Sequence, residues 1–250
     1  MDIFSYMRSN SQWFEDFITR STYHSNAIEG STLSFADTYA ILWNDSSMKV
    51  SATARELYDV INHKYALQIA LQTPHEQLTE RLIKDIAIQI NKNINDIDGY
   101  RKTQVYIRSS EYIPPKASEI NQLMQQLLYN HTHTMYDSVF EKEAAFHITF
   151  EHIHPFVDGN GRTGRILLNR ALIAAGVAPI VIPVESKRIY LESIESYDTK
   201  GLAKLIESLS AQEMLRMKEQ AQSQEEFEAG IPSASKINKK VSDIFNNKQN

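Results

Sequence analysis

The stretch HPFVDGNGRTGR, residues 154–165, constrains this chain more than any other feature of its sequence. It contains three of the 8 glycines found in 250 residues, together with Asp158, Arg162 and Arg165. Glycine permits backbone conformations that other residues avoid, and arginine keeps its positive charge at any physiological pH. The stretch therefore predicts a turn whose backbone and charges have a chemical role, and three interpretations of it compete.

The first interpretation is a dinucleotide-binding turn, because Gly159, Gly161 and Gly164 form the pattern G-x-G-x-x-G. That pattern is specific only where it follows the first strand of a βαβ unit. Here the preceding segment VFEKEAAFHITFEHI is typical of a helix, and Pro155 would interrupt a strand leading into the turn. The second interpretation, a plain helix–loop–helix turn, explains the glycines but leaves the crowding of charges around them unexplained.

The third interpretation, which we favour, is an anion cradle. The backbone N–H groups of residues 159–161 can point into one concavity, and the helix predicted over residues 162–175 directs its positive dipole end at the same place. Arg162 and Arg165 lie three residues apart on that helix, so both can reach a polyphosphate. Asp158 would repel phosphate unless a Mg²⁺ ion lay between them, which makes it the predicted metal ligand.

His154 stands before Pro155 and is the candidate general base, since an imidazole titrates near neutral pH. A zinc site that also uses His147 and His152 is the alternative for these histidines. Spacings of five and two residues do not place the three rings on one helix face, and no HExxH pattern is present. We therefore expect a structural role for His147.

The composition is that of a globular protein, with 42% hydrophobic and 23% charged residues. A net charge of -5 argues against a nucleic-acid-binding protein, and the absence of cysteine excludes disulfides, thiolate metal sites and cysteine nucleophiles. The first residues lack the apolar core of a signal peptide, and the longest apolar stretch, ILLNRALIAAGVAPIVIPV, is broken by polar residues. We expect a soluble, cytoplasmic protein that binds neither nucleic acid nor membrane.

Helical periodicity dominates the chain. Apolar residues recur every three to four positions over residues 11–28, and Gly30 is placed to end that helix. Ser34, with Asp37 three residues on, is expected to cap a second helix, and Thr73 a third. Further helices are indicated by three apolar groups: Leu82, Ile83, Ile86, Ile90 and Ile94; Leu123, Met124, Leu127 and Leu128; Ala144 and Ile148.

Strand signals are few. The segments TQVYI and EYI flank RSS and are followed by two prolines, which predicts one small hairpin over residues 103–113. The run PIVIPV near Ile180 is also β-branched. From Ala221 the tail is polar, apart from one short predicted helix carrying Ile237, Val241, Ile244 and Phe245.

Residues 154–165 resemble the signature of Fic-domain proteins, H-P-F-x-[D/E]-G-N-G-R-x-x-R, at every fixed position. The segments AAFHITFEHIHPF, GYRKTQVYI and RILLNRALIAAGVAPIVI resemble the core of the same family. The resemblance implies an all-α, mainly helical Fic fold with one small β-hairpin flap. It divides the chain into an N-terminal helical region over residues 1–74, a Fic core domain over residues 75–210 and a helical, polar tail over residues 211–250.

Fic-domain proteins usually transfer AMP from ATP to a side-chain hydroxyl of a protein, and the resemblance implies that activity here. His154 would deprotonate a tyrosine, serine or threonine hydroxyl, and Asp158 would hold Mg²⁺ against the phosphates. Arg162 and Arg165 would bind the β- and γ-phosphates. The nucleotide-binding residues that the resemblance implies are Gly159, Asn160, Gly161, Arg162, Thr163, Gly164, Arg165 and Tyr190.

The predicted hairpin is similar to the flap of the family. This implies that its exposed edge holds the target segment by β-augmentation, through Thr103, Gln104, Val105, Tyr106 and Ile107. Tyr190 falls where the family places an aromatic residue beside the adenine. The family often has a second tyrosine next to it, and Leu191 takes that place here. An ordinary surface hairpin and a simple core tyrosine are the alternatives.

The stretch SNAIEG, residues 25–30, resembles the inhibitory motif of the family, [S/T]-x-x-x-E-[G/N], in the class that carries it ahead of the core. Its three specified positions are Ser25, Glu29 and Gly30. Glu29 ends a predicted helix, where the dipole favours a cation, so a partner such as Arg165 would offset that cost. A Glu29–Arg165 pair would deprive the γ-phosphate of its ligand. The alternative is a glutamate that faces water.

Two other functions stay open at the level of the sequence. The same site can work in reverse, with Glu29 orienting a water molecule that hydrolyses AMP from a modified protein. The other is a regulator that binds ATP and a partner without turnover, although it would have no need of His154. The expected partners are ATP and a protein substrate, and the sequence leaves self-modification and a homo-oligomer open.

Overall fold

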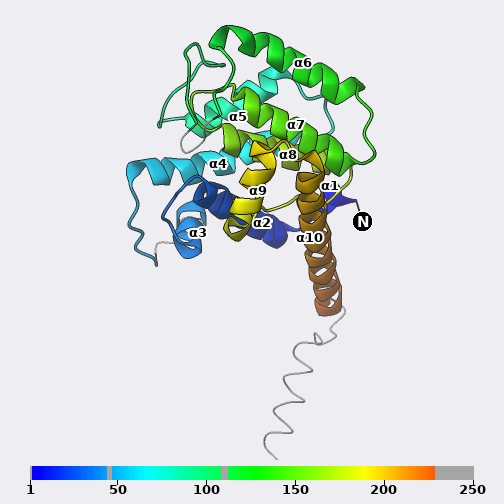
Figure 1. Ribbon diagram of the computed structural model, residues 1–250. Helices are drawn as coiled ribbons and strands as arrows, with labels where there is room; N and C mark the ends of the chain where they lie inside the picture. The colour runs from blue at the N-terminus through cyan, green and yellow to red at the C-terminus, as the bar shows by residue number, and fades with distance from the viewer. Residues whose placement is uncertain (1, 44–46, 108–111, 229–250) are drawn as a thin grey trace, which may run out of the picture. The chain divides into compact units, whose positions relative to one another are not determined.

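The computed structural model describes residues 2–43, 47–107 and 112–228. The chain divides into two compact units, Met1–Ser210 and Ala211–Asn250. The first unit contains the helices α1 to α9 and the beginning of α10 (Thr199–Glu228), and the second contains the rest of that helix (Figure 1).

The first unit starts with four helices: α1 (Ile3–Ser9), α2 (Ser11–Ile28), α3 (Phe35–Trp43) and α4 (Ala54–Gln72). The bounds predicted for α2 are confirmed, and Trp13 and Phe17 stack on its buried side with 5.0 Å between their ring centroids. The chain turns after α2 because Gly30 takes a φ of 99°, which suits glycine. The predicted cap of α3 is confirmed too, since Ser34 Oγ accepts a hydrogen bond from Asp37 N at 3.1 Å.

One predicted helix start is wrong. Thr73 does not open a helix but closes α4, and the cap of the next helix, α5 (Glu80–Asn91), is Thr79. Thr79 Oγ1 accepts a hydrogen bond from Leu82 N at 3.2 Å, which satisfies a backbone group that the helix leaves unpaired. A residue before proline avoids the helical conformation, so Thr73 in front of Pro74 marks a helix end as readily as a start.

The remaining helices of this unit are α6 (Ile120–His133), α7 (Val139–Ile153), α8 (Asn160–Ala174) and α9 (Lys187–Glu195), with single 3₁₀ turns η1 (Ala117–Glu119) and η2 (Val184–Ser186). Helix α8 is buried along most of its length because α2, α4, α5 and α7 pack against it; Figure 1 shows it among them. It begins at Asn160, earlier than the predicted start at residue 162. The N–H groups of residues 160 and 161 therefore belong to its first turn, which leaves them without partners inside the helix.

The β-hairpin predicted over residues 103–113 is not observed. The described residues of this segment form no strand, and residues 108–111 lie outside the described part. Side-chain hydrogen bonds, and not a strand ladder, hold the described part of this segment. For example, Gln104 Nε2 donates a hydrogen bond to Pro114 O at 2.9 Å. Pro114 has no N–H group and cannot extend a ladder. The fold is therefore all-α in the part of the chain that the structure describes.

The β-branched run near Ile180 is not a strand either. The side chain of Asn169 in α8 replaces a strand partner, because its Oδ1 accepts from Ile180 N at 2.7 Å and its Nδ2 donates to Ile180 O at 2.9 Å. Ile180 packs in a hydrophobic core cluster with Ile28, Leu168 and Ile206. The end of α2, which carries Ile28, is thereby tied into the same core as α8.

Within the described ranges, no helix combines the length and the apolar character needed to cross a membrane. Helix α10 continues to Glu228, beyond the point at which the polar tail was predicted to begin. The short helix predicted around Ile237 and Phe245 lies outside the described residues.

Candidate active site

Two residues with positive φ shape the loop between α7 and α8. His154 ends α7 with a φ of 50°, and Gly159 precedes α8 with a φ of 76°. A Cβ atom on residue 159 would lie 2.6 Å from Ile90 Cγ2, so this position requires glycine. Asn160 fixes the loop from inside, because its Oδ1 accepts from Phe156 N and its Nδ2 donates to Phe156 O, both at 2.9 Å. The Asn160 side chain is thus structural, and its backbone N–H remains for the predicted cradle.

The backbone around His154 is held by the buried residue Arg101. Arg101 Nε donates to His154 O at 2.8 Å, and Arg101 N donates to Pro155 O at 2.8 Å. The His154 ring lies with its Nδ1 3.3 Å from Glu151 O, which places the ring proton on Nδ1 and leaves a lone pair on Nε2. Burial lowers the pKa of His154, so the imidazole is neutral at pH 7 and able to accept a proton.

Asp158 and Arg162 pair with two residues of α4. Arg55 Nη2 donates to Asp158 Oδ2 at 2.5 Å, and Arg162 Nη1 pairs with Asp59 Oδ1. Arg162 Nη2 also lies 3.3 Å from Asp158 Oδ1. Burial alone would raise the pKa of Asp158, but the guanidinium groups of Arg162 and Arg55 hold that pKa below its ordinary value. Asp158 is therefore ionised at neutral pH, as a metal ligand must be.

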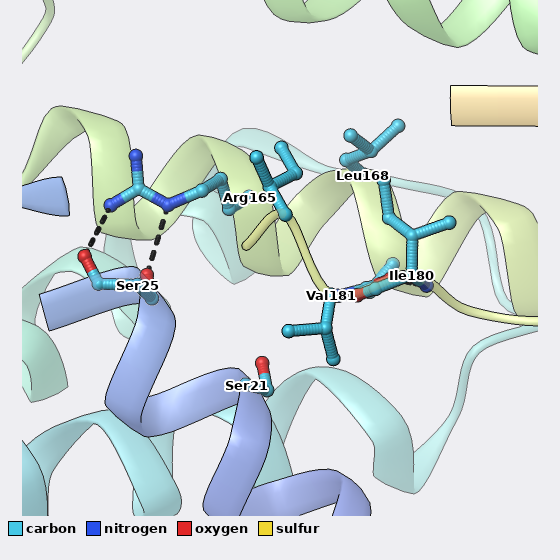
Figure 2. Close-up of a pocket in the computed structure, with 8 residues that line it drawn as sticks. Ser21, Ser25, Arg165, Leu168, Ile180 and Val181 are labelled. Carbon is cyan, nitrogen blue, oxygen red and sulfur yellow. Dashed lines mark hydrogen bonds between the residues drawn. The ribbon is translucent and has the colours of Figure 1, made fainter. Parts of the chain in front are cut away.

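Arg165 lies buried against the end of α2. Its Nε donates to Ser25 Oγ at 2.9 Å and its Nη2 donates to Ser25 O at 3.0 Å, as Figure 2 shows. Nη2 also donates to Glu29 Oε1 at 2.7 Å, and Nη1 lies 3.4 Å from Tyr190 Oη. Ser25 and Glu29, two of the three specified positions of the SNAIEG stretch, thus contact the arginine that is expected to bind the γ-phosphate.

The carboxylate of Glu29 reaches Arg165 across Gly161. A Cβ atom on residue 161 would lie 2.5 Å from Glu29 Oε1, so any larger residue would displace that carboxylate. The Glu29 side chain is 43% exposed and that of Arg165 is 7% exposed. Burial opposes the charge on Glu29, but the Arg165 guanidinium and its hydrogen bond hold the pKa of Glu29 below its ordinary value. The two residues therefore form an ion pair at neutral pH.

A cavity of about 420 Å³ adjoins these residues, and this volume lies in the range of small-molecule sites. Its lining consists of Ile28, Glu29, Ile107, Tyr112, Glu151, His152, His154, Gly161, Arg165, Lys187, Tyr190, Leu191, Ile194 and Glu195. His154 and Arg165 therefore face one space, together with Glu29. Of the five predicted flap residues Ile107 contributes to the lining, while the Tyr106 side chain is 78% exposed.

The largely buried polar side chains of His147, Glu151 and Tyr190 lie next to Arg165. His147 Nε2 is 2.8 Å from Tyr190 Oη and 3.8 Å from Glu151 Oε1. Burial, aided by the charge of Arg165, lowers the pKa of His147 to about 3. Burial raises the pKa of Glu151 to about 8, although the Arg165 charge opposes that shift. His147 and Glu151 are therefore neutral at pH 7, which leaves Glu29 as the nearby anion for Arg165.

Three residues expected to bind nucleotide are packed inside the protein. Thr163 is 0% exposed, and a Cβ atom on Gly164 would lie 2.8 Å from Glu151 Oε1. Tyr190 is 1% exposed, although it contributes to the cavity wall. The structure therefore shows how these three residues pack. Their contacts with nucleotide stay predictions, and so does the position of Tyr190 beside the adenine.

No pattern in the sequence pointed to Arg55, Asp59 or Arg101 as site residues. Local signals for α4 exist, since a capping box stands at residues 53–56 and Arg55 and Asp59 are opposite charges one helical turn apart. The contact of Arg55 with Asp158 joins residues 103 positions apart. Such a contact depends on how the helices pack, which no local pattern encodes.

The chemistry of the donors fits Mg²⁺ at Asp158. Mg²⁺ usually binds one or two carboxylates and takes phosphate oxygens and water as its other ligands. Asp158 is an ionised carboxylate at the start of α8, where the dipole and two arginines favour phosphate. The described residues contain no group of three His, Cys, Asp or Glu side chains arranged to hold a metal ion by themselves. Asp158 would thus hold a metal that arrives with its phosphates.

The fold and the site define a domain that is all-α in its described residues, in which a glycine-rich loop leads into the first turn of a buried helix. Residues 77–172 match the Fic/DOC family. The proteins named protein adenylyltransferase Fic from Drosophila sechellia and Drosophila melanogaster are each 33% identical to this chain over 181 residues. The similarity covers 67% of this chain and 35% of each relative, so the chain spans about a third of the curated relatives' length. The chain therefore contains a Fic/DOC family domain, as residues 154–165 predicted.

Solved structures confirm the fold. A Fic-domain-containing signaling protein from Bacteroides thetaiotaomicron has a TM-score of 0.73 and 22% identity, with 86% of this chain and 93% of that one covered. Fic-1 from C. elegans has a TM-score of 0.69 and 25% identity, with 88% of this chain and 66% of that one covered. The all-α Fic fold expected from the sequence is thus confirmed.

Proposed function

We propose that this protein is a protein adenylyltransferase that transfers AMP from ATP to a tyrosine, serine or threonine hydroxyl of a protein, and that Glu29 inhibits it. One observation carries the proposal: His154 and Arg165 face one cavity of about 420 Å³, and Glu29 lies 2.7 Å from Arg165 in that cavity. The match to the Fic/DOC family and the names of the Drosophila relatives support the same activity.

The reaction is a displacement at the α-phosphorus of ATP. The target hydroxyl oxygen forms a new bond to that phosphorus, and the bond from the phosphorus to the oxygen shared with the β-phosphate breaks. Diphosphate leaves with the electron pair of that bond. His154 Nε2 accepts the hydroxyl proton, a role that suits the neutral imidazole and the proton assigned to Nδ1.

Charge stabilisation comes from the start of α8. The N–H groups of residues 160 and 161 stand in its first turn, where they and the helix dipole stabilise the charge that grows on the phosphate oxygens. Arg162 and Arg165 hold the outer phosphates, and Asp158 would hold Mg²⁺. When bound, Mg²⁺ neutralises part of the phosphate charge. Positioning and charge therefore supply most of the catalysis, as in other phosphoryl transfers.

Glu29 inhibits this reaction by occupying Arg165. A carboxylate and a γ-phosphate cannot both bind Arg165 Nη2 without strong repulsion between their charges. The ionised Glu29 therefore keeps the outer phosphates out of line for transfer. Movement of the end of α2, or substitution of Glu29, removes the competitor and leaves Arg165 for ATP.

The reverse activity, removal of AMP from a modified protein, is the second candidate. It is favoured by the place of Glu29, whose partly exposed carboxylate lines the same cavity as His154 and can orient a water molecule there. Binding of ATP without turnover, as in a sensor, is less well supported because the neutral His154 has no purpose in a binding protein.

The test uses ATP labelled on either the α- or the γ-phosphate, Mg²⁺, and a cell lysate as the source of acceptor proteins. Above the label that the lysate incorporates by itself, Glu29→Gly should add α-label and no γ-label to protein, and Glu29→Gly with His154→Ala should add neither. The labelled proteins are then purified and treated with the wild type. Loss of label at that stage favours AMP removal, and ATP binding without any labelled protein favours the sensor.

A further inference from the structure

Four charged side chains form a closed ring beside the start of α8: Arg55, Asp158, Arg162 and Asp59. Arg55 Nη2 lies 2.5 Å from Asp158 Oδ2, and Asp158 Oδ1 lies 3.3 Å from Arg162 Nη2. Arg162 Nη1 pairs with Asp59 Oδ1, and Asp59 Oδ2 lies 3.6 Å from Arg55 Nε. Charges of opposite sign therefore alternate around the ring. Two of its members come from α4 and two from the motif that starts α8.

The ion pairs of the ring engage the oxygen atoms of Asp158 and the nitrogen atoms of Arg162 that would bind a metal–phosphate ligand. Both oxygens of Asp158 are engaged, Oδ2 by Arg55 and Oδ1 by Arg162 and by Gly159 N at 2.6 Å. Both terminal nitrogens of Arg162 are engaged by carboxylates as well. A divalent cation on Asp158 would be repelled by the guanidinium of Arg55, and a phosphate on Arg162 by the carboxylate of Asp59.

The two arginines differ in their freedom to move. The side chain of Arg55 is 57% exposed, whereas that of Arg162 is 3% exposed. Arg55 can therefore swing into solvent at little cost, while Arg162 is held by its surroundings. Arg55 and Asp59 stand one turn apart on α4, which lets them pair with each other once both have released the motif.

We propose that Arg55 and Asp59 are two further positioning residues of the nucleotide site, which hold Asp158 and Arg162 and are exchanged for a metal–phosphate ligand. Arg55 is exchanged for the metal ion at Asp158, and Asp59 is exchanged for a phosphate at Arg162. The inference rests on the proposed function, because the ligand it names is ATP with a divalent cation. It is separate from the action of Glu29, which contacts Arg165.

The metal half of the exchange is tested with Mn²⁺, whose binding is read by electron paramagnetic resonance. All proteins carry Glu29→Gly, and the nucleotide is an ATP analogue with a methylene bridge between the α- and β-phosphates, which prevents transfer. Exposed ion pairs contribute a factor of about two to five. Arg55→Gln should therefore bind Mn²⁺ about threefold more tightly in the presence of the analogue.

A matched control is Arg81→Gln, because Arg81 also pairs with an aspartate one turn on, Asp85 at 3.8 Å, in helix α5. It should leave Mn²⁺ affinity unchanged. Equal or weaker Mn²⁺ binding by Arg55→Gln would overturn the metal half, since Arg55 would then be irrelevant to Asp158 or would itself bind the nucleotide.

The phosphate half is tested without metal, in EDTA, by calorimetry with the same analogue. Asp59→Asn keeps the shape of the residue and removes the charge that competes for the buried Arg162, so it should bind the analogue at least about threefold more tightly. Unchanged or weaker binding would overturn the phosphate half of the proposal. Asp59 would then orient Arg162 for phosphate binding and would not compete with the phosphate. Should Asp59→Asn not fold, Asp59→Ser, which also removes the charge, takes its place with the same expected result, and Arg55→Gln still decides the metal half. If the Glu29→Gly parent binds no analogue, the proposed function fails and takes this inference with it; if the parent binds and the variants match it, only the inference fails.

Discussion

At the scale of single residues, the site is a set of balanced charges. Three positive and three negative side chains meet there: Arg55, Arg162, Arg165, Asp59, Asp158 and Glu29. A buried charge costs several kcal/mol unless it is paired, so the buried Arg162 and Arg165 need anions whether or not a nucleotide is bound. Carboxylates supply those anions in this structure. On the proposed function, binding of a polyphosphate would therefore replace one set of anions by another.

The neutral carboxyl of Glu151 yields a prediction about stability. Its pKa is raised from 4.5 to about 8 by burial and by the charge of Glu29, against the effect of Arg165. The folded protein thus binds more protons than the unfolded chain between these pH values, and its stability falls as pH rises through that window. Glu151→Gln mimics the protonated form, so it should remove a pH-dependent loss on the order of 3 to 5 kcal/mol.

Urea unfolding of wild type and Glu151→Gln at several pH values between 5 and 9 checks this expectation. The variant should gain stability over the wild type as pH rises, with no further gain above about pH 8. Glu207→Gln, at an exposed position, is the matched control and should run parallel to the wild type. Parallel curves for Glu151→Gln would show that Glu151 is ionised in the folded protein at neutral pH.

At the scale of elements, the end of α2 is the part that decides whether Arg165 is free. Ile28 anchors this end in the hydrophobic core cluster, and Ser25 and Glu29 contact Arg165 from successive turns of the helix. The end of α2 is thus held by apolar contacts on one side and by polar and ionic contacts with Arg165 on the other. Loss of one polar contact should loosen the end of the helix without unfolding it.

Ser25→Ala removes the hydrogen bond from Arg165 Nε and keeps the one to Ser25 O. A hydrogen bond to a charged group contributes about 1.5 to 3 kcal/mol, so the variant should be less stable by a similar amount. It should also transfer AMP severalfold faster than the wild type, because Glu29 is held less firmly. Thermal unfolding and the rate of α-label transfer measure the two effects.

Ser21→Ala is the control for this experiment. Ser21 stands one turn earlier on α2 and borders the same narrow gap beside Arg165 in Figure 2, but no bond joins it to Arg165 there. It should leave the transfer rate at the wild-type level. Equal transfer rates for Ser25→Ala and Ser21→Ala would show that the Ser25 hydrogen bond does not contribute to inhibition by Glu29.

Elements also show what a sequence can and cannot predict. The bounds of α2 follow from its periodic apolar face and Gly30, and the cap of α3 follows from Ser34 and Asp37, because these are local signals. No strand is observed in the run near Ile180 or in the described residues of the predicted hairpin, because β-branched residues also suit extended segments held by side chains, as Asn169 holds Ile180. Local propensity cannot tell these cases apart.

At the scale of the whole molecule, the motif and its surroundings differ in how well they can be predicted. Residues 154–165 carry most of the cradle in one continuous stretch, so their pattern was sufficient to predict the family. The residues that restrain the cradle come from elsewhere: Arg55 and Asp59 from α4, and Ser25 and Glu29 from α2. Of these, the α2 residues were found through a second motif, and the α4 residues required the structure.

The central claim is that one domain contains both the AMP-transfer site and the carboxylate that blocks it. The most direct test is the intact mass of wild type and Glu29→Gly after incubation with Mg²⁺ and ATP under identical conditions, with the protein as its own acceptor. Glu29→Gly should gain the mass of AMP, and the wild type should gain much less because Glu29 occupies its Arg165. Equal gain by the two proteins would contradict it, because Arg165 would then serve ATP with Glu29 still in place.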